Sequence, residues 1–352
     1  MRKTIIFFLL TGLMFSGLQA GGLDSLFRNI YEKPVMATGE NSNVFSNALL
    51  ATINETTVSF NKELISKLKQ INGLSVYYFD KNFLLINWGV PEENGTVSYR
   101  GALWVWNEAK KNYKVQILND ISSYQTFPEK EIYSTENWWG ALYYQCIAEG
   151  DYYTLLGWNS SQPLYSQKVI ETMRVKSDGS VEFGLPVFTN QQGVLMRKFN
   201  VDAASTEYYV LERRYAKSKK TATTEEVVNS DFDESTLNPD GSTSSTKKPL
   251  RRIIFKFSRK QDMILRYDYQ SYVDKSGTKE KQRKENLIVF DRILPRDASL
   301  GGQASNYVPE GGVYDGFRFE NGKWKLVLNV IARNPNPKPN KKQAIRNKIV
   351  KQ

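Results

Sequence analysis

The chain has 352 residues, with 48 lysines and arginines against 37 aspartates and glutamates, and a formal net charge of +11. It contains no histidine and one cysteine, Cys146. No side chain therefore has an ordinary pKa near neutrality. This composition excludes Ser-His-Asp triads, Cys-His nucleophiles, HExxH zinc sites and histidine-ligated haem, and with them most side-chain chemistry that enzymes use at neutral pH.

The first twenty residues are typical of a secretory signal peptide. Arg2 and Lys3 precede an apolar stretch, and small and polar residues lead to Ala20, after which we predict cleavage. An uncleaved membrane anchor is the alternative, but the apolar stretch is interrupted and shorter than the roughly 20 residues that a span needs. We expect an exported protein that is periplasmic, outer-membrane-associated or extracellular, with no transmembrane span.

Two stretches near the N-terminus repeat apolar residues at helical spacing. One covers residues 23–31 and ends before Pro34, and the other covers residues 60–71 and ends at Asn72-Gly73. We expect residues 21–73 to form a helical lead-in whose apolar stripes lie on a core.

From residue 74 onward, short runs rich in Val, Ile, Tyr, Phe and Trp alternate with Gly, Asn, Asp and Pro, which predicts strands joined by turns. We predict strands near residues 74–80, 83–88, 97–106, 112–118, 139–148, 152–158, 167–175, 181–187, 194–199, 206–215, 252–258, 262–270, 286–293, 314–319 and 323–331. Asn94-Gly95, Asp178-Gly179 and Asn321-Gly322 predict tight hairpins. The fold class is therefore mainly β, an antiparallel meander of about fifteen strands packed as a large sandwich or open barrel, with a propeller-like arrangement as the alternative.

We expect residues 74–333 to form one β-rich domain with a flexible insertion at 216–250, whose polar composition cannot bury enough apolar surface to become ordered. The acidic residues of this insertion do not have the spacing of a calcium loop. Cys146 lies in an apolar run and is interpreted as a small buried residue, since a lone thiol cannot form an internal disulfide.

Residues 334–352 form a basic tail rich in proline and lysine. Seven basic residues and no acidic ones lie after residue 332, whereas residues 21–332 carry 39 basic against 37 acidic side chains. The nearly neutral body therefore predicts no binding of nucleic acid. The tail could touch anionic surfaces, although a solubilising role is the simpler interpretation.

Trp104 and Trp106 lie two residues apart on one predicted strand and should share a face. In an open groove these rings could stack on sugars as a carbohydrate-binding platform. Buried, they would fill the interface of a sheet, which is the simpler interpretation.

Hydrolysis without histidine is possible through paired carboxylates, as in glycosidases. Glu108, Glu136, Asp291 and Asp315 lie near predicted strand ends, but nothing in their spacing pairs them. The Ser-x-x-Lys run at residues 66–69 lacks the partner motifs of penicillin-recognising enzymes, and no glycine-rich phosphate motif occurs. We therefore assign no catalytic residue, metal ligand or cofactor.

Seven aromatic-rich segments carry a resemblance to other proteins. They are residues 83–88, 139–144, 153–158, 183–188, 288–291, 314–317 and 322–324. On these segments the chain resembles a group of uncharacterised exported β-rich proteins from Bacteroidetes-type bacteria, over roughly residues 74–333 without the insertion. The resemblance implies a bacterial envelope setting and one β-rich domain, and it implies no chemistry.

The leading hypothesis is an exported, non-enzymatic envelope or secreted protein that acts as a binding or structural module for an envelope protein or glycan. The alternative is a carbohydrate-binding protein or a carboxylate-pair glycan hydrolase that uses the face of Trp104 and Trp106. A third possibility is a surface-assembly component that docks through the basic tail.

Overall fold

The computed structural model describes residues 20–32, 38–54, 60, 62–79, 81–124, 131–189, 251–274, 281–297, 299 and 303–331, together with the backbone of strands β10 (Leu195–Val201), β11 (Thr206–Glu212), β12 (Thr236–Leu237) and β13 (Thr243–Ser244). The expected signal peptide before Ala20, the expected basic tail and most of the expected insertion lie outside these residues. Within the described residues, no helix is long and apolar enough to cross a membrane.

Helices α2 (Ala20–Glu32), α3 (Thr38–Asn54) and α4 (Lys62–Leu68) precede the first sheet. α2 and α4 coincide with the two predicted helical stretches, whereas α3 was not predicted. Its 17 residues include four asparagines, which have low helix propensity and dilute the apolar repeat. The buried apolar residues of α3 still follow one stripe, and they are Phe45, Ala48, Leu49 and Ile53.

The first sheet is an antiparallel meander in the order β1-β2-β3-β4. Its strands are β1 (Ser75–Phe79), β2 (Phe83–Pro91), β3 (Val97–Asn107) and β4 (Asn112–Asn119). The predicted turn at Asn94-Gly95 joins β2 to β3, with Gly95 at a φ of 77°. All residues of β2 from Phe83 to Val90 are buried, because the sheet is covered on both faces, and this explains the uninterrupted apolar run in the sequence.

The second sheet has the order β14-β7-β6-β5, with β8 paired to β7. Its strands are β5 (Leu142–Glu149), β6 (Tyr152–Asn159), β7 (Tyr165–Val175), β8 (Val181–Phe183) and β14 (Ile253–Ser258). β14 follows the predicted insertion in the chain and pairs with β7, so the chain returns to the second sheet after the insertion.

The third sheet has the order β15-β16-β17-β18-β9. Its strands are β15 (Leu265–Asp274), β16 (Lys281–Pro295), β17 (Tyr307–Glu320), β18 (Lys323–Ile331) and β9 (Phe188–Thr189), and a short helix, η4 (Ala304–Asn306), precedes β17. β9 pairs with β18 in parallel, an exception to the predicted antiparallel order. Asn321 and Gly322 form the predicted tight turn, with φ values of 52° and 75°.

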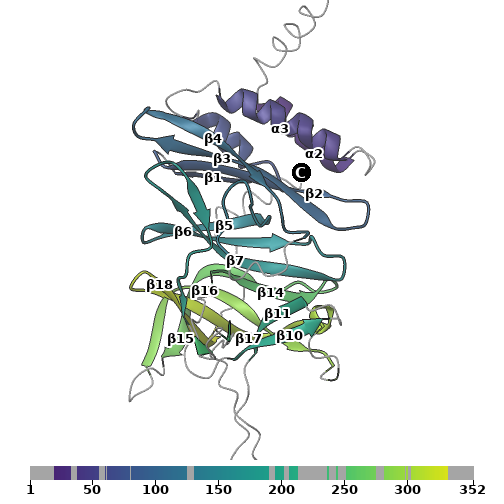
Figure 1. The fold of residues 1–352 in the computed structure, drawn as a ribbon, viewed down its shortest axis with the longest axis vertical. Coiled ribbons are helices and arrows are strands. Elements are labelled where there is room, and N and C mark those ends of the chain that lie inside the picture. The colour runs from purple at the N-terminus through teal and green to yellow at the C-terminus, as the bar shows by residue number, and fades with distance from the viewer. Residues whose placement is uncertain are drawn as a thin grey trace, which may run out of the picture.

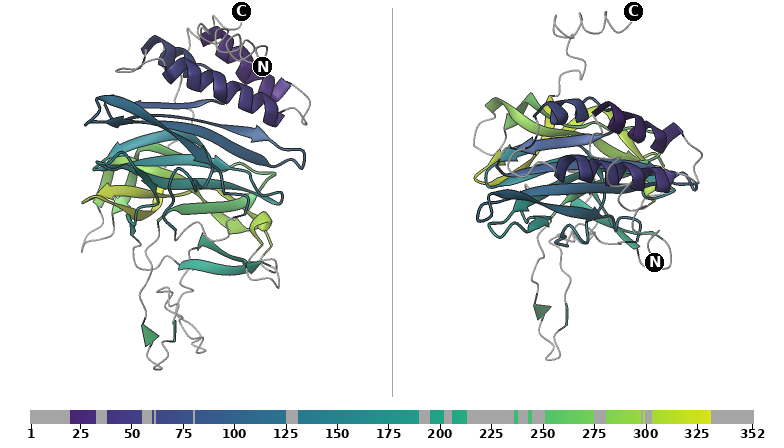
Figure 2. Two further views of the ribbon diagram at one scale, coloured as in Figure 1. Left: turned by 45° about the horizontal axis from the view of Figure 1, so that its top comes forward. Right: turned by 90° about the horizontal axis from the view of Figure 1, so that it is seen from above.

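The helices and the three sheets lie one on another as four layers (Figures 1 and 2). One hydrophobic cluster fills the space between the helices and the first sheet, a second lies between the first and second sheets, and a third lies between the second and third sheets. The chain is therefore mainly β and packed as a sandwich, as predicted, but with three large stacked sheets and a helical cover, while β10–β11 and β12–β13 form two separate two-stranded sheets.

Side-chain hydrogen bonds join each layer to the next. The Trp88 Nε1 donates to Ser42 Oγ of α3 at 3.0 Å, and Asn87 Nδ2 donates to the Ala141 carbonyl of the second sheet at 2.5 Å. The Trp324 Nε1 of the third sheet donates to Thr154 Oγ1 of the second at 2.8 Å. These bonds fix the relative position of the layers, which apolar packing alone does not specify.

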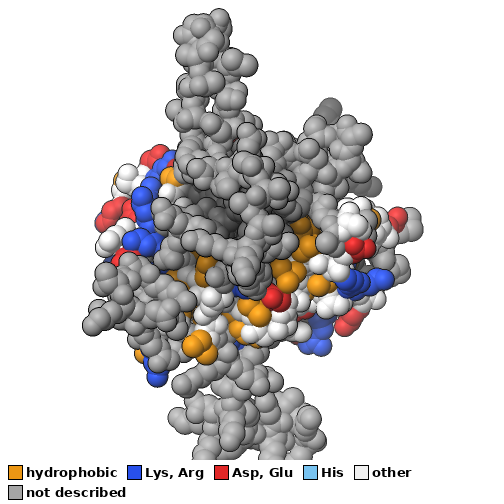
Figure 3. Space-filling view, turned by 90° about the horizontal axis from the view of Figure 1, so that it is seen from below, with side chains coloured by type: hydrophobic (Ala, Val, Ile, Leu, Met, Phe, Trp, Pro, Cys, Tyr) orange, Lys and Arg blue, Asp and Glu red, His pale blue; other side chains and the backbone are white. Residues whose placement is uncertain are grey.

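The end of the molecule opposite the helices presents a mixed surface. Figure 3 shows hydrophobic side chains toward the middle of this view and charged side chains of both signs at its margins.

Candidate functional site: a groove between two sheet edges

The two tryptophans proposed as a sugar platform share one face of β3, as predicted, but that face is turned toward the helices. Trp104 is 2% exposed and meets Phe60 edge to face, with the ring centroids 6.4 Å apart. Trp106 lies at the end of the strand, half-buried against Tyr113. Trp104 is thus part of the core beneath the helices, because an apolar face of a sheet is where helices pack, and a two-ring platform is not formed.

The four candidate carboxylates do not meet in one site. Glu108 is bound by Lys111 and by the Trp106 Nε1 in the turn after β3, and Glu136 is exposed in the loop before β5. Asp291 pairs in register with Tyr314, and Asp315 with Phe290, so the two aspartates leave opposite faces of the third sheet. Their positions do not give the carboxylate pair that a glycosidase needs.

Each of the two sheet aspartates has a structural partner. Asp315 accepts two hydrogen bonds from the Arg292 guanidinium, at 2.7 and 3.0 Å, and a third from the Asn329 amide. Asp291 accepts the Ile264 amide at 2.5 Å, at the start of β15. Burial raises the pKa of the Asp291 carboxyl above its ordinary value.

Cys146 is half-buried in β5, where it packs against the cluster between the first and second sheets. Burial raises the pKa of its thiol to about 12. The thiol therefore stays protonated at neutral pH, and the thiolate that would act as a nucleophile or metal ligand does not form. Among the described residues, no three acidic or cysteine side chains converge as they would around a metal ion.

A hollow in the described part of the chain lies where the edge of the first sheet meets the edge of the second. We call it the β1–β5 groove, and it has a volume of about 480 Å³. Its lining residues are Lys69, Gly73, Leu74, Ser75, Val76, Tyr77, Leu142, Tyr143 and Tyr144. This volume lies within the range of roughly 300–1,000 Å³ that is typical of small-molecule sites.

One wall of the groove is the connection from α4 into β1. Lys69 lies just after α4, and Gly73 turns the chain into β1 with a φ of 88°, which favours glycine. β1 is the edge strand of its sheet, since it pairs with β2 alone. Lys69 is exposed and has no carboxylate partner among the described residues, so it supplies a free cation at this wall.

The opposite wall is the start of β5, where two tyrosines are fixed by their hydroxyl groups. Tyr143 donates to the buried Glu171 carboxylate at 2.5 Å and accepts the Trp138 Nε1 at 2.9 Å. Tyr144 is 40% exposed, donates to the Leu265 carbonyl at 2.9 Å, and has the Lys168 ammonium 5.0 Å from its ring centroid. Tyr143 is fully buried behind the wall, and the partly exposed Tyr144 ring is held in place before any ligand binds, which lowers the entropic cost of binding.

The groove combines apolar side chains, phenol rings and one cation, and no carboxylate lines it. Burial raises the pKa of Tyr77, Tyr143 and Tyr144, so all three phenols stay neutral, and the hydroxyl protons of Tyr143 and Tyr144 are already donated within the protein. Such a lining can bind and orient a ligand but has no evident acid–base pair. The sequence did not indicate the groove, because residues 74–77 and 142–144 read as ordinary strand segments.

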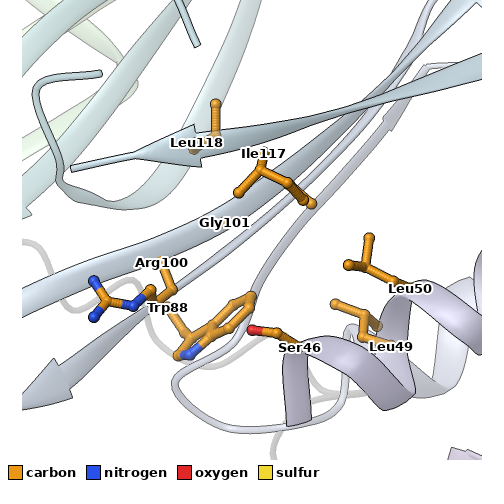
Figure 4. A pocket seen from close by; sticks show the side chains of 9 residues that line it. Ser46, Leu49, Leu50, Trp88, Arg100, Gly101, Ile117 and Leu118 are labelled. Carbon is orange, nitrogen blue, oxygen red and sulfur yellow. The ribbon is translucent and has the colours of Figure 1, made fainter. Parts of the chain in front are cut away.

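A second, smaller pocket of about 50 Å³ lies between α3 and the first sheet (Figure 4). Ser46, Leu49 and Leu50 of α3 form one side, and Trp88, Arg100 and Ile117 belong to the facing strands. Its size suits one side chain rather than a whole ligand.

Comparison with known proteins gives no match for this chain among protein-family models, curated proteins or solved structures.

Proposed function

We propose that this chain is an exported, non-enzymatic binding or structural module of a bacterial cell envelope, which holds an extended ligand in the β1–β5 groove. The groove is the observation that carries the proposal, because it has the volume of a ligand site and walls fixed by hydrogen bonds. The layout of the first twenty residues supports export. The final compartment is periplasmic, outer-membrane-associated or extracellular.

The ligand class follows from the lining. The Tyr144 ring is partly exposed and offers an aromatic surface, while Lys69 offers a cation to a carboxylate or hydroxyl-rich chain. A glycan strand bearing carboxylates therefore fits better than a purely apolar ligand. Carbohydrate binding therefore remains a candidate function, but we place the binding site in the groove instead of on Trp104 and Trp106.

The test is calorimetric titration of the mature protein with soluble cell-wall glycan strands and with an acidic unstructured peptide. Tyr144→Ala should weaken binding of the preferred ligand by roughly 2- to 12-fold, which corresponds to about 0.5–1.5 kcal/mol for one aromatic contact. Tyr144→Phe keeps the ring and should retain most of the affinity. Tyr124→Ala is the matched control, because Tyr124 is 70% exposed and does not line the groove.

Two results would contradict the proposal. The first is an affinity that Tyr144→Ala and Lys69→Gln leave unchanged. The second is turnover of chromogenic glycosides, esters or β-lactams by the wild-type protein that is abolished by one carboxylate substitution, such as Asp291→Asn.

A further inference from the structure

The outer edge of β4 is a free edge of the first sheet, on the side opposite β1. β4 pairs with β3 alone, and at Asn119 its outward backbone groups are already used: the Asn119 amide donates to Thr135 O, and its carbonyl accepts Trp138 N, both at 2.9 Å. Outward-pointing backbone groups recur at every second residue of a strand, so the backbone N–H and C=O groups of Val115 and Ile117 also point away from β3. Their amides and carbonyls have no partner among the described residues.

The side of this edge that faces the helices is apolar. Ile117 is 47% exposed and forms part of the small pocket with Leu49 and Leu50 of α3 (Figure 4). A strand laid beside β4 would direct alternate side chains to this side of the sheet. The pocket would then receive one apolar side chain, for which it has the size.

The charged side chains of the small pocket and of β4 itself are positive. Arg100 also lines the pocket, and its one hydrogen bond among the described residues goes to the neighbouring Tyr99 carbonyl at 3.1 Å. Lys114 is exposed on the face of β4 that is turned away from the helices, and it forms no ion pair in the described part of the chain. The sequence of β4 contains no acidic residue. A lysine on an edge strand commonly prevents pairing with an identical strand of another copy. The same positive charge favours pairing with a strand that carries acidic side chains.

We propose that the β4 edge binds an extended, acidic segment of a partner polypeptide by strand addition, with one apolar side chain of that segment in the small pocket and a carboxylate on Arg100. A second copy of this chain is a poor occupant, because a β4–β4 contact would bring Lys114 and Arg100 against their own counterparts without a carboxylate. This surface lies on the opposite edge of the first sheet from β1, so the proposal is independent of the groove.

The test is selection of a displayed library of random ten-residue segments on the mature protein. We expect enrichment of segments that alternate apolar residues with aspartate or glutamate. Val115→Pro removes an outward amide that the β3–β4 ladder does not use, and should weaken the selected segments by roughly 2- to 12-fold, the loss of about one hydrogen bond. The double substitution Arg100→Glu with Lys114→Glu should switch the enrichment from acidic to basic segments.

Two controls keep the test decisive. Ile117→Glu introduces a like charge without touching the backbone, and it should weaken acidic segments even if Val115→Pro disturbs folding. Lys69→Gln lies in the β1–β5 groove and should leave the selected segments bound, which separates this proposal from the proposed function. Absence of enrichment, no acidic preference, equal binding to the Ile117→Glu variant, or a dimer that Ile117→Glu dissociates would each overturn it.

Discussion

The two faces of the first sheet are packed in different ways. The helix-facing side is almost wholly apolar, and the Trp88–Ser42 hydrogen bond is a polar contact that it makes with α3. The interface with the second sheet contains a fully buried ion pair, with a shortest separation of 2.6 Å, between Glu171 of β7 and Arg252, which directly precedes β14. The stability of the first interface depends on the volume and shape of apolar side chains. The stability of the second also depends on two buried charges, and removing either one leaves the other buried without a partner.

Tyr143 joins this buried pair to the groove. Its hydroxyl donates to Glu171, and the residue, whose side chain is fully buried, lies at the wall of the β1–β5 groove. The Arg252 guanidinium also donates to the Glu131 carbonyl at 2.9 Å and lies 4.5 Å from the Tyr133 ring centroid. The polar interface therefore holds the β5 wall of the candidate site, whereas Leu74 and Val76 on the opposite wall belong to the apolar interface.

The largest effect is expected from breaking the buried pair. Glu171→Leu leaves the Arg252 charge buried without its partner and should lower the free energy of unfolding by about 3–5 kcal/mol, measured by urea denaturation. The double substitution Glu171→Leu with Arg252→Met removes both charges. It should lower the free energy of unfolding by less than Glu171→Leu alone. A double variant less stable than the single one would remove the distinction between the two interfaces.

A smaller loss is expected from the helix side. Leu49→Ala leaves a cavity beneath α3, and we expect a loss of about 3 kcal/mol, within the range for buried leucines. Leu49→Met should restore most of it, since volume-conserving apolar changes are tolerated where no charge is involved. Failure of Leu49→Met to recover stability in the same urea titration would mean that this interface is more specific than its composition indicates.

The smallest effect is a pH dependence at Asp291, in the third sheet. Burial raises its pKa above the ordinary value of 3.8, so the folded protein binds this proton more tightly than the unfolded chain does. The contribution of the protonated Asp291 carboxyl to the free energy of unfolding is complete below pH 3.8. It is lost as the pH rises through the raised pKa of the folded protein. Asp291→Asn should therefore gain stability relative to the wild type as the pH increases. Urea titrations from acid to neutral pH that give a constant or falling difference would contradict this assignment.

The parts of the fold that could be predicted were those with local signals. The hairpins at Asn94-Gly95 and Asn321-Gly322 follow from turn residues that accept positive φ, and the strand runs follow from their composition. α3 was missed because its asparagines obscure the apolar stripe. The face on which Trp104 lies could not be assigned as open or covered, because alternation along a strand does not say what packs on each side.

The candidate site was beyond the reach of the sequence for a related reason. The groove exists because two edge strands far apart in the chain, near Ser75 and Tyr143, come together when the sheets stack. Asp291 and Asp315 come close in the third sheet, yet the strand register places them on opposite faces. Long-range pairing decides both outcomes, and no local motif records it.

The central claim is that the β1–β5 groove is a ligand site, and its most direct test is ¹⁹F NMR of the mature protein with 3-fluorotyrosine at all tyrosines. Tyr144→Phe and Tyr124→Phe assign the groove and control resonances. During titration with soluble cell-wall glycan strands, the account predicts a saturable shift of the Tyr144 resonance with the Tyr124 resonance unchanged. Saturable binding that leaves Tyr144 unmoved, or that shifts both resonances equally, would contradict it.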